Sequence, residues 1–282
     1  MNTTATTELR EVHGPSAVGG GRRRFFDLLW LLAVTEFKRT YFGTVLGYVW
    51  SLIRPLALFG VLLFVFTQVF KLGSNVPNYP VLLLLGIVLF TLFQEGTQTA
   101  LTSVLGQEGV VRKTQFPRLV IPLSAVLTAG FNFSLNLVIV FAFILAWGVD
   151  PAWTWLLFPL AVGALAVFTC AIGMMLSVLY VRFRDLAIIW VVAVQILFYA
   201  TPVLYPIEKL ENVRLEHLLM LNPLAVILEQ VRFWVIDPTA PTAAEAAGGA
   251  AHLLPALAIF LAVCVLGVRT FSREAPRVAE NL

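Results

Sequence analysis

The sequence predicts an all-α integral membrane protein with six transmembrane helices, an N-terminal interfacial helix and a re-entrant outer helical hairpin before the last span. Hydrophobic residues make up 59% of the 282 residues, charged residues only 12%, and the apolar residues fall in six long runs. About 20 helical residues cross a hydrocarbon core of about 30 Å. Because lipid offers no partner for backbone polar groups, we expect these runs to be helices.

The runs define one transmembrane domain over residues 22–268. They cover residues 48–70, 79–103, 120–147, 153–180, 186–205 and 253–268. Residues 1–21 are polar and end in glycines, which indicates a disordered tail, and residues 269–282 form a second tail. We expect both tails to be cytoplasmic, and the domain leaves no room for a separate soluble enzyme.

The positions of the basic residues predict the orientation. With the N-terminus in the cytoplasm, 15 of the 19 Lys and Arg residues lie on the inner side. Short cytoplasmic loops carry this excess in membrane proteins. The inner residues are Arg10, Arg22, Arg23, Arg24, Lys38, Arg39, Arg54, Arg112, Lys113, Arg118, Arg182, Arg184, Arg269, Arg273 and Arg277. The inner loops thus account for the net charge of +3, and no nucleic-acid partner is needed to explain it.

Residues 22–40 are too short and too charged to span the membrane. One helical face carries Arg24, Asp27, Thr35 and Lys38, with Leu31 as the exception, whereas Phe26, Leu29 and Trp30 populate the rest. This pattern favours a helix lying along the cytoplasmic surface. The alternative is a basic flank that only fixes orientation.

Residues 206–238, on the outer side, alternate charged and apolar residues. The pair Asn222-Pro223 begins a stretch of about 13 residues that carries Glu229 and Arg232 and is too short to cross. We expect two amphipathic helices that dip into the membrane and return. Residues 239–251, with Pro241, Gly248 and Gly249, are expected to form a plain loop.

Two helical faces carry polar residues inside the runs. Such residues are costly in lipid and face a partner or a cavity. One alternative is hydrogen bonding between helices, and the other is a polar translocation path. The faces carry Glu95, Gln98 and Thr102 in the second run, and Thr128, Asn132 and Asn136 in the third.

The sequence shows no catalytic or cofactor site. The segment Gly109–Thr114 lacks the glycine that precedes the lysine of a phosphate-binding loop. His13, His217 and His252 sit in unrelated regions, so we expect no metal site and no catalytic triad. We expect a non-enzymatic protein without a cofactor of its own.

Two inner features allow two interpretations each. Arg54, before Pro55, either extends to the lipid head groups or binds an anionic group such as phosphate. The segment 104–118 is charged, contains two glycines and ends near Phe116-Pro117. It is either a solvated loop or a short helix that docks onto another protein.

Several ordered motifs resemble the membrane subunits of ABC-2 type polysaccharide exporters. Residues 40–55 (TYFGTVLGYVWSLIRP) are similar to the start of their first span, and residues 109–124 (GVVRKTQFPRLVIPLS) to their first cytoplasmic loop. Further matches are YVRFRD at 180–185, TPVLYP at 201–206 and LNPL at 221–224. Together they extend over most of the chain.

The resemblance implies a homodimeric permease in the bacterial plasma (inner) membrane, paired with two cytoplasmic ATPase subunits that bind ATP and Mg. Its substrates would be lipid-linked glycans such as O antigens, teichoic acids and related cell-wall polymers. Rival functions are an ABC-2 exporter of a small amphiphile or drug, and a membrane-embedded lipid-modifying enzyme.

The resemblance also implies residue roles. Residues 107–118 would couple the permease to ATP hydrolysis, 180–185 would be a second contact, and 206–236 would be the outer gate. The coupling candidates are Gln107, Glu108, Arg112, Lys113, Phe116, Arg118, Arg182, Arg184 and Asp185. We expect Lys38, Arg39, Tyr41 and Arg54 to receive the lipid pyrophosphate. Glu95, Gln98, Thr102, Asn132 and Asn136 would line the path.

Overall fold

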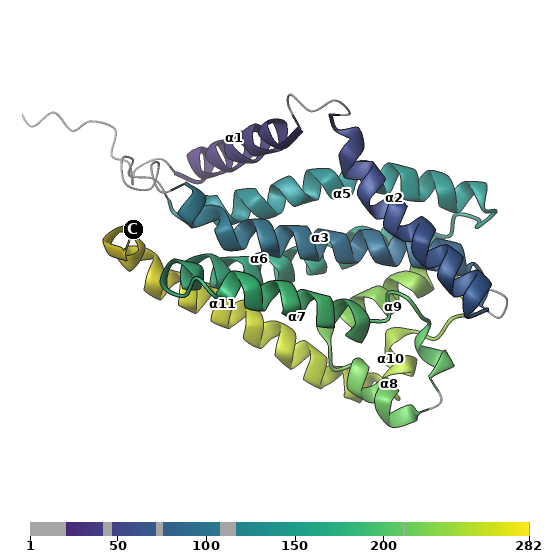
Figure 1. Cartoon of the computed structure of the whole chain (residues 1–282). Helices are drawn as coiled ribbons and strands as arrows, with labels where there is room; N and C mark the ends of the chain where they lie inside the picture. The colour runs from purple at the N-terminus through teal and green to yellow at the C-terminus, as the bar shows by residue number, and fades with distance from the viewer. Residues whose placement is uncertain (1–20, 42–46, 72–75, 108–116, 211, 282) are drawn as a thin grey trace, which may run out of the picture.

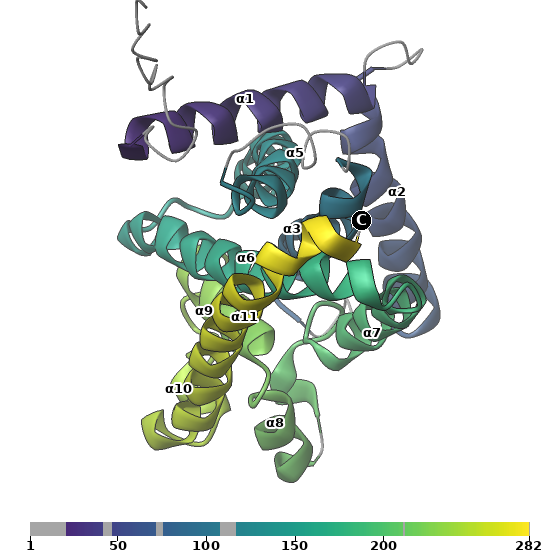
Figure 2. The same cartoon turned by 90° about the vertical axis from the view of Figure 1, so that its left-hand side faces the viewer.

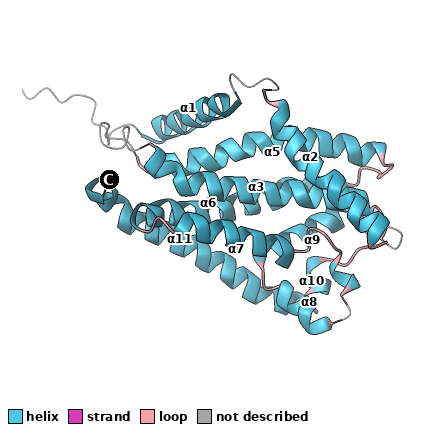
Figure 3. Ribbon diagram, in the orientation of Figure 1, coloured by secondary structure: helices cyan, strands magenta, loops and turns pink. Residues whose placement is uncertain are grey.

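The computed structural model describes residues 21–41, 47–71, 76–107, 117–210 and 212–281, and helices form most of this part of the chain (Figures 1 and 3). No strand occurs in the described residues. The long helices are α1 (Gly21–Tyr41), α2 (Val49–Phe64), α3 (Tyr79–Gly106), α5 (Val120–Ala146), α6 (Phe158–Arg182), α7 (Leu186–Ala200) and α11 (Leu254–Asn281). The short elements are η1 (Val65–Val69), η3 (Trp153–Leu157), η4 (Ile207–Lys209), α8 (Val213–Leu219), α9 (Pro223–Val235), α10 (Ala243–Ala246) and η5 (Ala250–Leu253).

Five of the described helical segments are long and apolar enough to cross a membrane. They are Val49–Val69, Tyr79–Gly106, Val120–Ala146, Trp153–Arg182 and Ala250–Ala275. Each begins within about three residues of a predicted run. The total of six spans stays a prediction, because α7 has only 15 residues and is about 22 Å long.

The predicted run 186–205 is wrong over its last five residues. The helix ends at Ala200, and Thr201 adopts an extended conformation before Pro202. A residue before proline is disfavoured in the helical region, which explains the break. The following turn, residues 201–204, is buried, and the Tyr79 hydroxyl donates a hydrogen bond of 2.8 Å to its Leu204 carbonyl oxygen.

Helix α3 lies at the centre of the bundle. In its most apolar stretch 78% of the residues are buried, against 17% in α2 and 11% in α11. It packs mainly on α5 and α6, and small residues permit the close approach. A Cβ atom built on Gly96 would lie 2.6 Å from the Thr169 methyl group. The exposed apolar faces of α2, α7 and α11 therefore form the outside of the bundle.

Helix α11 continues 13 residues beyond the predicted span end at 268. Phe271 and Ala275 are buried against Ile121 and Met174, and this packing keeps the extension helical. Further back, Gly267 packs directly on α6, where an added Cβ would lie 2.3 Å from the Ala171 carbonyl oxygen. Residues 269–281 are thus part of the last helix.

The bundle has two distinct ends. Helix α1, the end of α3, the start of α5 and the end of α11 meet at one, which we call the basic end, and α8, α9 and α10 lie at the other (Figures 1 and 2). The predicted loop 239–251 is wrong in part, because it contains α10. Thr242 and Glu245 cap this helix reciprocally, a local signal that the composition of the segment hid.

Candidate functional site

Helix α1 is fixed across α5 at the basic end (Figure 2). Ala33 is fully buried, and the Thr128 hydroxyl lies 3.2 Å from the Ala33 carbonyl oxygen and 2.9 Å from the Ser124 carbonyl oxygen. Trp30 and Phe37 each pack edge-on against Phe131. The helix matches the predicted bounds 22–40 closely, while its position on a membrane surface stays a prediction.

This crossing brings Tyr41 into a polar cluster that we call the Asn132 cluster: Tyr41, Ser51, Glu95, Asn132 and Asn136. The Tyr41 hydroxyl donates to Asn132 Oδ1 at 3.0 Å, and Asn132 Nδ2 donates to Glu95 Oε2 at 3.1 Å. Asn136 Nδ2 donates to the carbonyl oxygens of Ser51 at 3.0 Å and Asn132 at 2.9 Å. Four helices, α1, α2, α3 and α5, are thereby hydrogen-bonded at one point.

The Asn132 cluster is closed. The void beside Pro55, Glu95 and Asn132 holds about 10 Å³, which is too little for a ligand and at the lower limit for one water. Burial raises the pKa of Tyr41. The negative charge of Glu95 adds to this effect, whereas the positive charge of Arg54 opposes it. In this structure Glu95, Asn132 and Asn136 therefore hydrogen-bond between helices, the first of the two alternatives. Their role in a translocation path stays a proposal.

A polar groove of about 360 Å³ lies beside the cluster, between α1, α3 and α5. It contains Arg39, whose side chain is 81% exposed and only loosely paired with Glu36 at 3.9 Å. Thr102 and Gln107 lie in the same groove, and Gln107 Oε1 is buried without a hydrogen-bond partner among the described residues. The structure thus unites one predicted head-group residue, one path residue and one coupling residue.

The other predicted site residues that the structure describes do not line this groove. Lys38 and Arg54 are exposed, and Gln98 is half-buried in α3 outside the hydrogen bonds of the cluster. Arg118 lies two residues before α5, and its guanidinium donates to the Ala275 carbonyl of α11. Glu108, Arg112, Lys113 and Phe116 lie outside the described residues.

The second predicted contact is an exposed turn between α6 and α7. Arg182, Arg184 and Asp185 are all exposed there. The Arg182 guanidinium lies over the Phe183 ring at 5.3 Å, and that of Arg184 over the Tyr180 ring at 5.7 Å. Stacking on an aromatic face restrains a cation while leaving it accessible.

At the opposite end, an ion cluster that was not predicted from the sequence joins η4 to α9. Arg232 contacts Glu208 at 2.5 and 2.6 Å and Glu229 at 3.0 Å. The side chains of Arg232 and Glu229 are only 6% and 2% exposed. Burial tends to raise the pKa of Glu208, but the hydrogen bonds and charge of Arg232 outweigh it and the pKa is lowered. The spacing of three between Glu229 and Arg232 was the available sequence signal.

The expectation that the histidines are unrelated was wrong for two of them. The rings of His217 and His252 stack with centroids 5.6 Å apart, because η5 folds back beside α8. His13 lies outside the described residues. Within the described part of the chain, no group of three or more His, Cys, Asp and Glu residues is arranged to hold a metal ion.

The sequence matches the model of the ABC-2 type transporter family over residues 27–234, from α1 to α9. The chain belongs to the ABC-2 type transporter family. It is also similar to proteins named O-antigen export system permease protein RfbA. One from Klebsiella pneumoniae is 31% identical over 205 residues, covering 72% of this chain and 78% of the relative. One from Myxococcus xanthus is 31% identical over 206 residues, covering 73% and 78%.

Membership explains the architecture described above. An ABC-2 type protein with five described helices long enough to span is a multi-pass membrane protein. The family match includes the Asn132 cluster, the polar groove and the ion cluster, but excludes α10 and α11.

Proposed function

We propose that this ABC-2 type protein is the permease subunit of an ATP-driven exporter that moves a lipid-linked polysaccharide across the bacterial plasma (inner) membrane. The observation that carries the proposal is the similarity to the O-antigen export permeases, which extends over 78% of their length. O antigen is accordingly the first candidate substrate, ahead of teichoic acid and other cell-wall glycans.

In this proposal the permease is a homodimer bound to two cytoplasmic ATPase subunits, which hold the ATP and Mg. The basic end faces the cytoplasm. This orientation is supported by the concentration of Lys and Arg at that end, because cytoplasmic loops of membrane proteins carry an excess of basic residues. Residues 107–118 and the exposed turn with Arg182, Arg184 and Asp185 would contact the ATPases.

The head group of the lipid carrier would bind beside α1. Arg39 is exposed in the polar groove and has no close carboxylate partner among the described residues, since Glu36 lies 3.9 Å away. A guanidinium with unused donors suits a pyrophosphate. Lys38 and Arg54 add positive charge, and Tyr41 is held in place by Asn132.

Opening of the Asn132 cluster would give the glycan a polar path. The helices α1, α2, α3 and α5 meet through hydrogen bonds at the cluster, so their separation would expose Glu95, Asn132 and Asn136 together. Gln98 and Thr102 would extend the polar surface along α3. At the far end, residues 206–236 would form a re-entrant outer gate.

The head-group assignment is tested by polysaccharide export in cells that lack the native permease. Arg39→Gln and Arg54→Gln are expected to reduce surface polysaccharide about tenfold or more, because a charge-assisted contact contributes about 1.5–3 kcal/mol. Arg214→Gln is the control, since it removes the same charge from exposed α8. Membrane insertion is measured in parallel. Export equal in all three variants would refute the assignment.

The function itself is tested by copurification from native membranes. We expect a stoichiometric ATPase whose activity changes on addition of lipid-linked glycan. Lipid-modifying activity of the isolated chain would instead support the enzyme alternative, and stimulation by small amphiphiles alone would support the drug-exporter alternative.

A further inference from the structure

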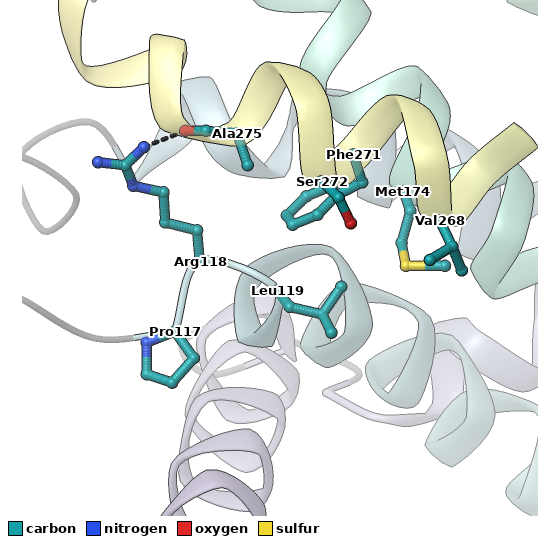
Figure 4. A pocket seen from close by; sticks show the side chains of 8 residues that line it. All are labelled: Pro117, Arg118, Leu119, Met174, Val268, Phe271, Ser272 and Ala275. Atoms are coloured by element: carbon teal, nitrogen blue, oxygen red, sulfur yellow. Dashed lines mark hydrogen bonds between the residues drawn. The ribbon is translucent and has the colours of Figure 1, made fainter. Parts of the chain in front are cut away.

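A second groove, separate from the head-group region, opens at the basic end between the start of α5, α6 and the end of α11 (Figure 4). Its volume is about 560 Å³, within the range of pockets that bind small molecules. Most of the wall is apolar and comes from Leu119, Met174, Val268 and Phe271. Val268 is 54% exposed, so the groove opens at the surface of the bundle.

Among the described residues that line the groove, Arg118 is the only charged one. Figure 4 shows it at one end, with Met174 and Val268 at the other. A guanidinium has five N–H donors, and the contact with the Ala275 carbonyl uses one. No carboxylate pairs with Arg118 in the described part of the chain. The unused donors are available to an anionic acceptor, which a guanidinium binds more strongly than a neutral one.

The groove also lies where the apolar part of α11 ends. The stretch that can span a membrane is Ala250–Ala275, and the exposed side chains of Arg269 and Arg273 lie on its last turns. An occupant would therefore have its apolar part in the hydrocarbon region and its charged part among arginines at the head-group level. A phospholipid has this arrangement, with acyl chains on one side and a phosphate on the other.

We propose that this groove binds one anionic glycerophospholipid of the adjacent leaflet. One acyl chain lies along Met174, Val268 and Phe271, and the phosphate accepts hydrogen bonds from Arg118. The negative charge of the lipid selects it over a zwitterionic lipid, because Arg118 is positive and no acidic residue is among the described residues that line the groove. The proposal concerns lipid binding, which can be measured directly without a transport assay.

The test is native mass spectrometry of the purified full-length protein with phosphatidylglycerol or phosphatidylcholine added separately. The wild type is expected to bind one phosphatidylglycerol about tenfold more tightly than phosphatidylcholine. This is the difference in affinity that one charge-assisted hydrogen bond contributes. Arg118→Gln should abolish this preference and Arg118→Lys should retain most of it. Arg214→Gln, at the far end of the bundle, is the matched control and should leave the preference unchanged.

A second variant tests the apolar wall without altering charge. Ser272 is exposed at the groove, so Ser272→Trp fills it from the outside and should displace the bound lipid. Helix content measured by circular dichroism verifies that each variant is folded. If Arg118→Gln does not fold, the binding of phosphatidylglycerol by Ser272→Trp tests the proposal. Equal binding of the two lipids by the wild type, or equal effects of the Arg118→Gln and Arg214→Gln substitutions, would overturn the proposal. So would unchanged binding of phosphatidylglycerol by Ser272→Trp.

Discussion

Replacement of Arg232 by Met is expected to destabilise the end of the bundle that contains α8–α10. Arg232 is the shared cation of two carboxylates, at 2.5 and 2.6 Å from Glu208 and 3.0 Å from Glu229. Methionine keeps the apolar length of the side chain but removes the charge. Glu229, only 2% exposed, would then be a buried carboxylate without its partner.

The magnitude follows from the different exposure of the two carboxylates. Removing one partner of a buried ion pair costs roughly 3–5 kcal/mol. Glu208 is 37% exposed and regains water, so only Glu229 contributes the full cost, and it can take up a proton. We therefore expect the lower limit, about 3 kcal/mol. At roughly 2–4 °C per kcal/mol, this corresponds to a fall in Tm of about 6–12 °C.

The assay is thermal unfolding of the detergent-solubilised protein at neutral pH. Arg214→Met is the control, because it removes an exposed charge from the same outer segment and should change stability by no more than about 0.5 kcal/mol. Adding Glu229→Gln to Arg232→Met should recover part of the loss. If the Arg232→Met and Arg214→Met variants have the same Tm, the ion cluster is not a determinant of stability and the reasoning is refuted.

Three further predictions concern stability under the same assay. Asn132→Leu removes the shared partner of the Asn132 cluster and should cost about 1–3 kcal/mol, whereas Ser134→Ala on the exposed side of α5 should cost little; equal losses would contradict the role of the cluster. Gly267→Ala places a methyl group against an α6 carbonyl and should cost about 1–3 kcal/mol, while Gly163→Ala, with open space around it, should be tolerated. The lowered pKa of Glu208 contributes stability above the ordinary Glu value of 4.5, and this is lost as pH falls through the lower folded-state value. Glu208→Gln should therefore reduce the dependence of Tm on pH below the ordinary Glu value of 4.5, and an unchanged slope would disprove the linkage.

Helix positions were predictable where local signals set them. The starts of α3 and α5 follow from where apolar residues begin, and the helices of the first run end close to the predicted limit. The early end of α7 was also indicated locally, by the pair Thr201-Pro202, but the apolar run continues past this pair and obscured it. The extension of α11 was not predictable in this way, because it depends on Phe271 packing against α5 and α6.

The candidate site was predictable only in part for the same reason. Spacing along one helix indicated the polar faces that contain Glu95 and Asn132. Whether Tyr41 joins them depends on α1 crossing α5, and the contact links residues 91 positions apart. The bond between Arg232 and Glu208 spans 24 positions and requires η4 to fold back on α9. Single-helix periodicity contains no information on either contact.

The close contact of Gly267 with α6 has a mechanical consequence for the last helix. Leu254–Asn281 is one continuous rod of about 42 Å, and Gly267 lies near its midpoint, about 20 Å from either end. A rod held tightly at its middle pivots there, and the two ends then move in opposite directions. A tilt of about 5° would displace each end by about 2 Å. A movement of α9 and η5 at one end would thus tilt α11 about Gly267, and the tilt would move the residues that contact Arg118 at the other end.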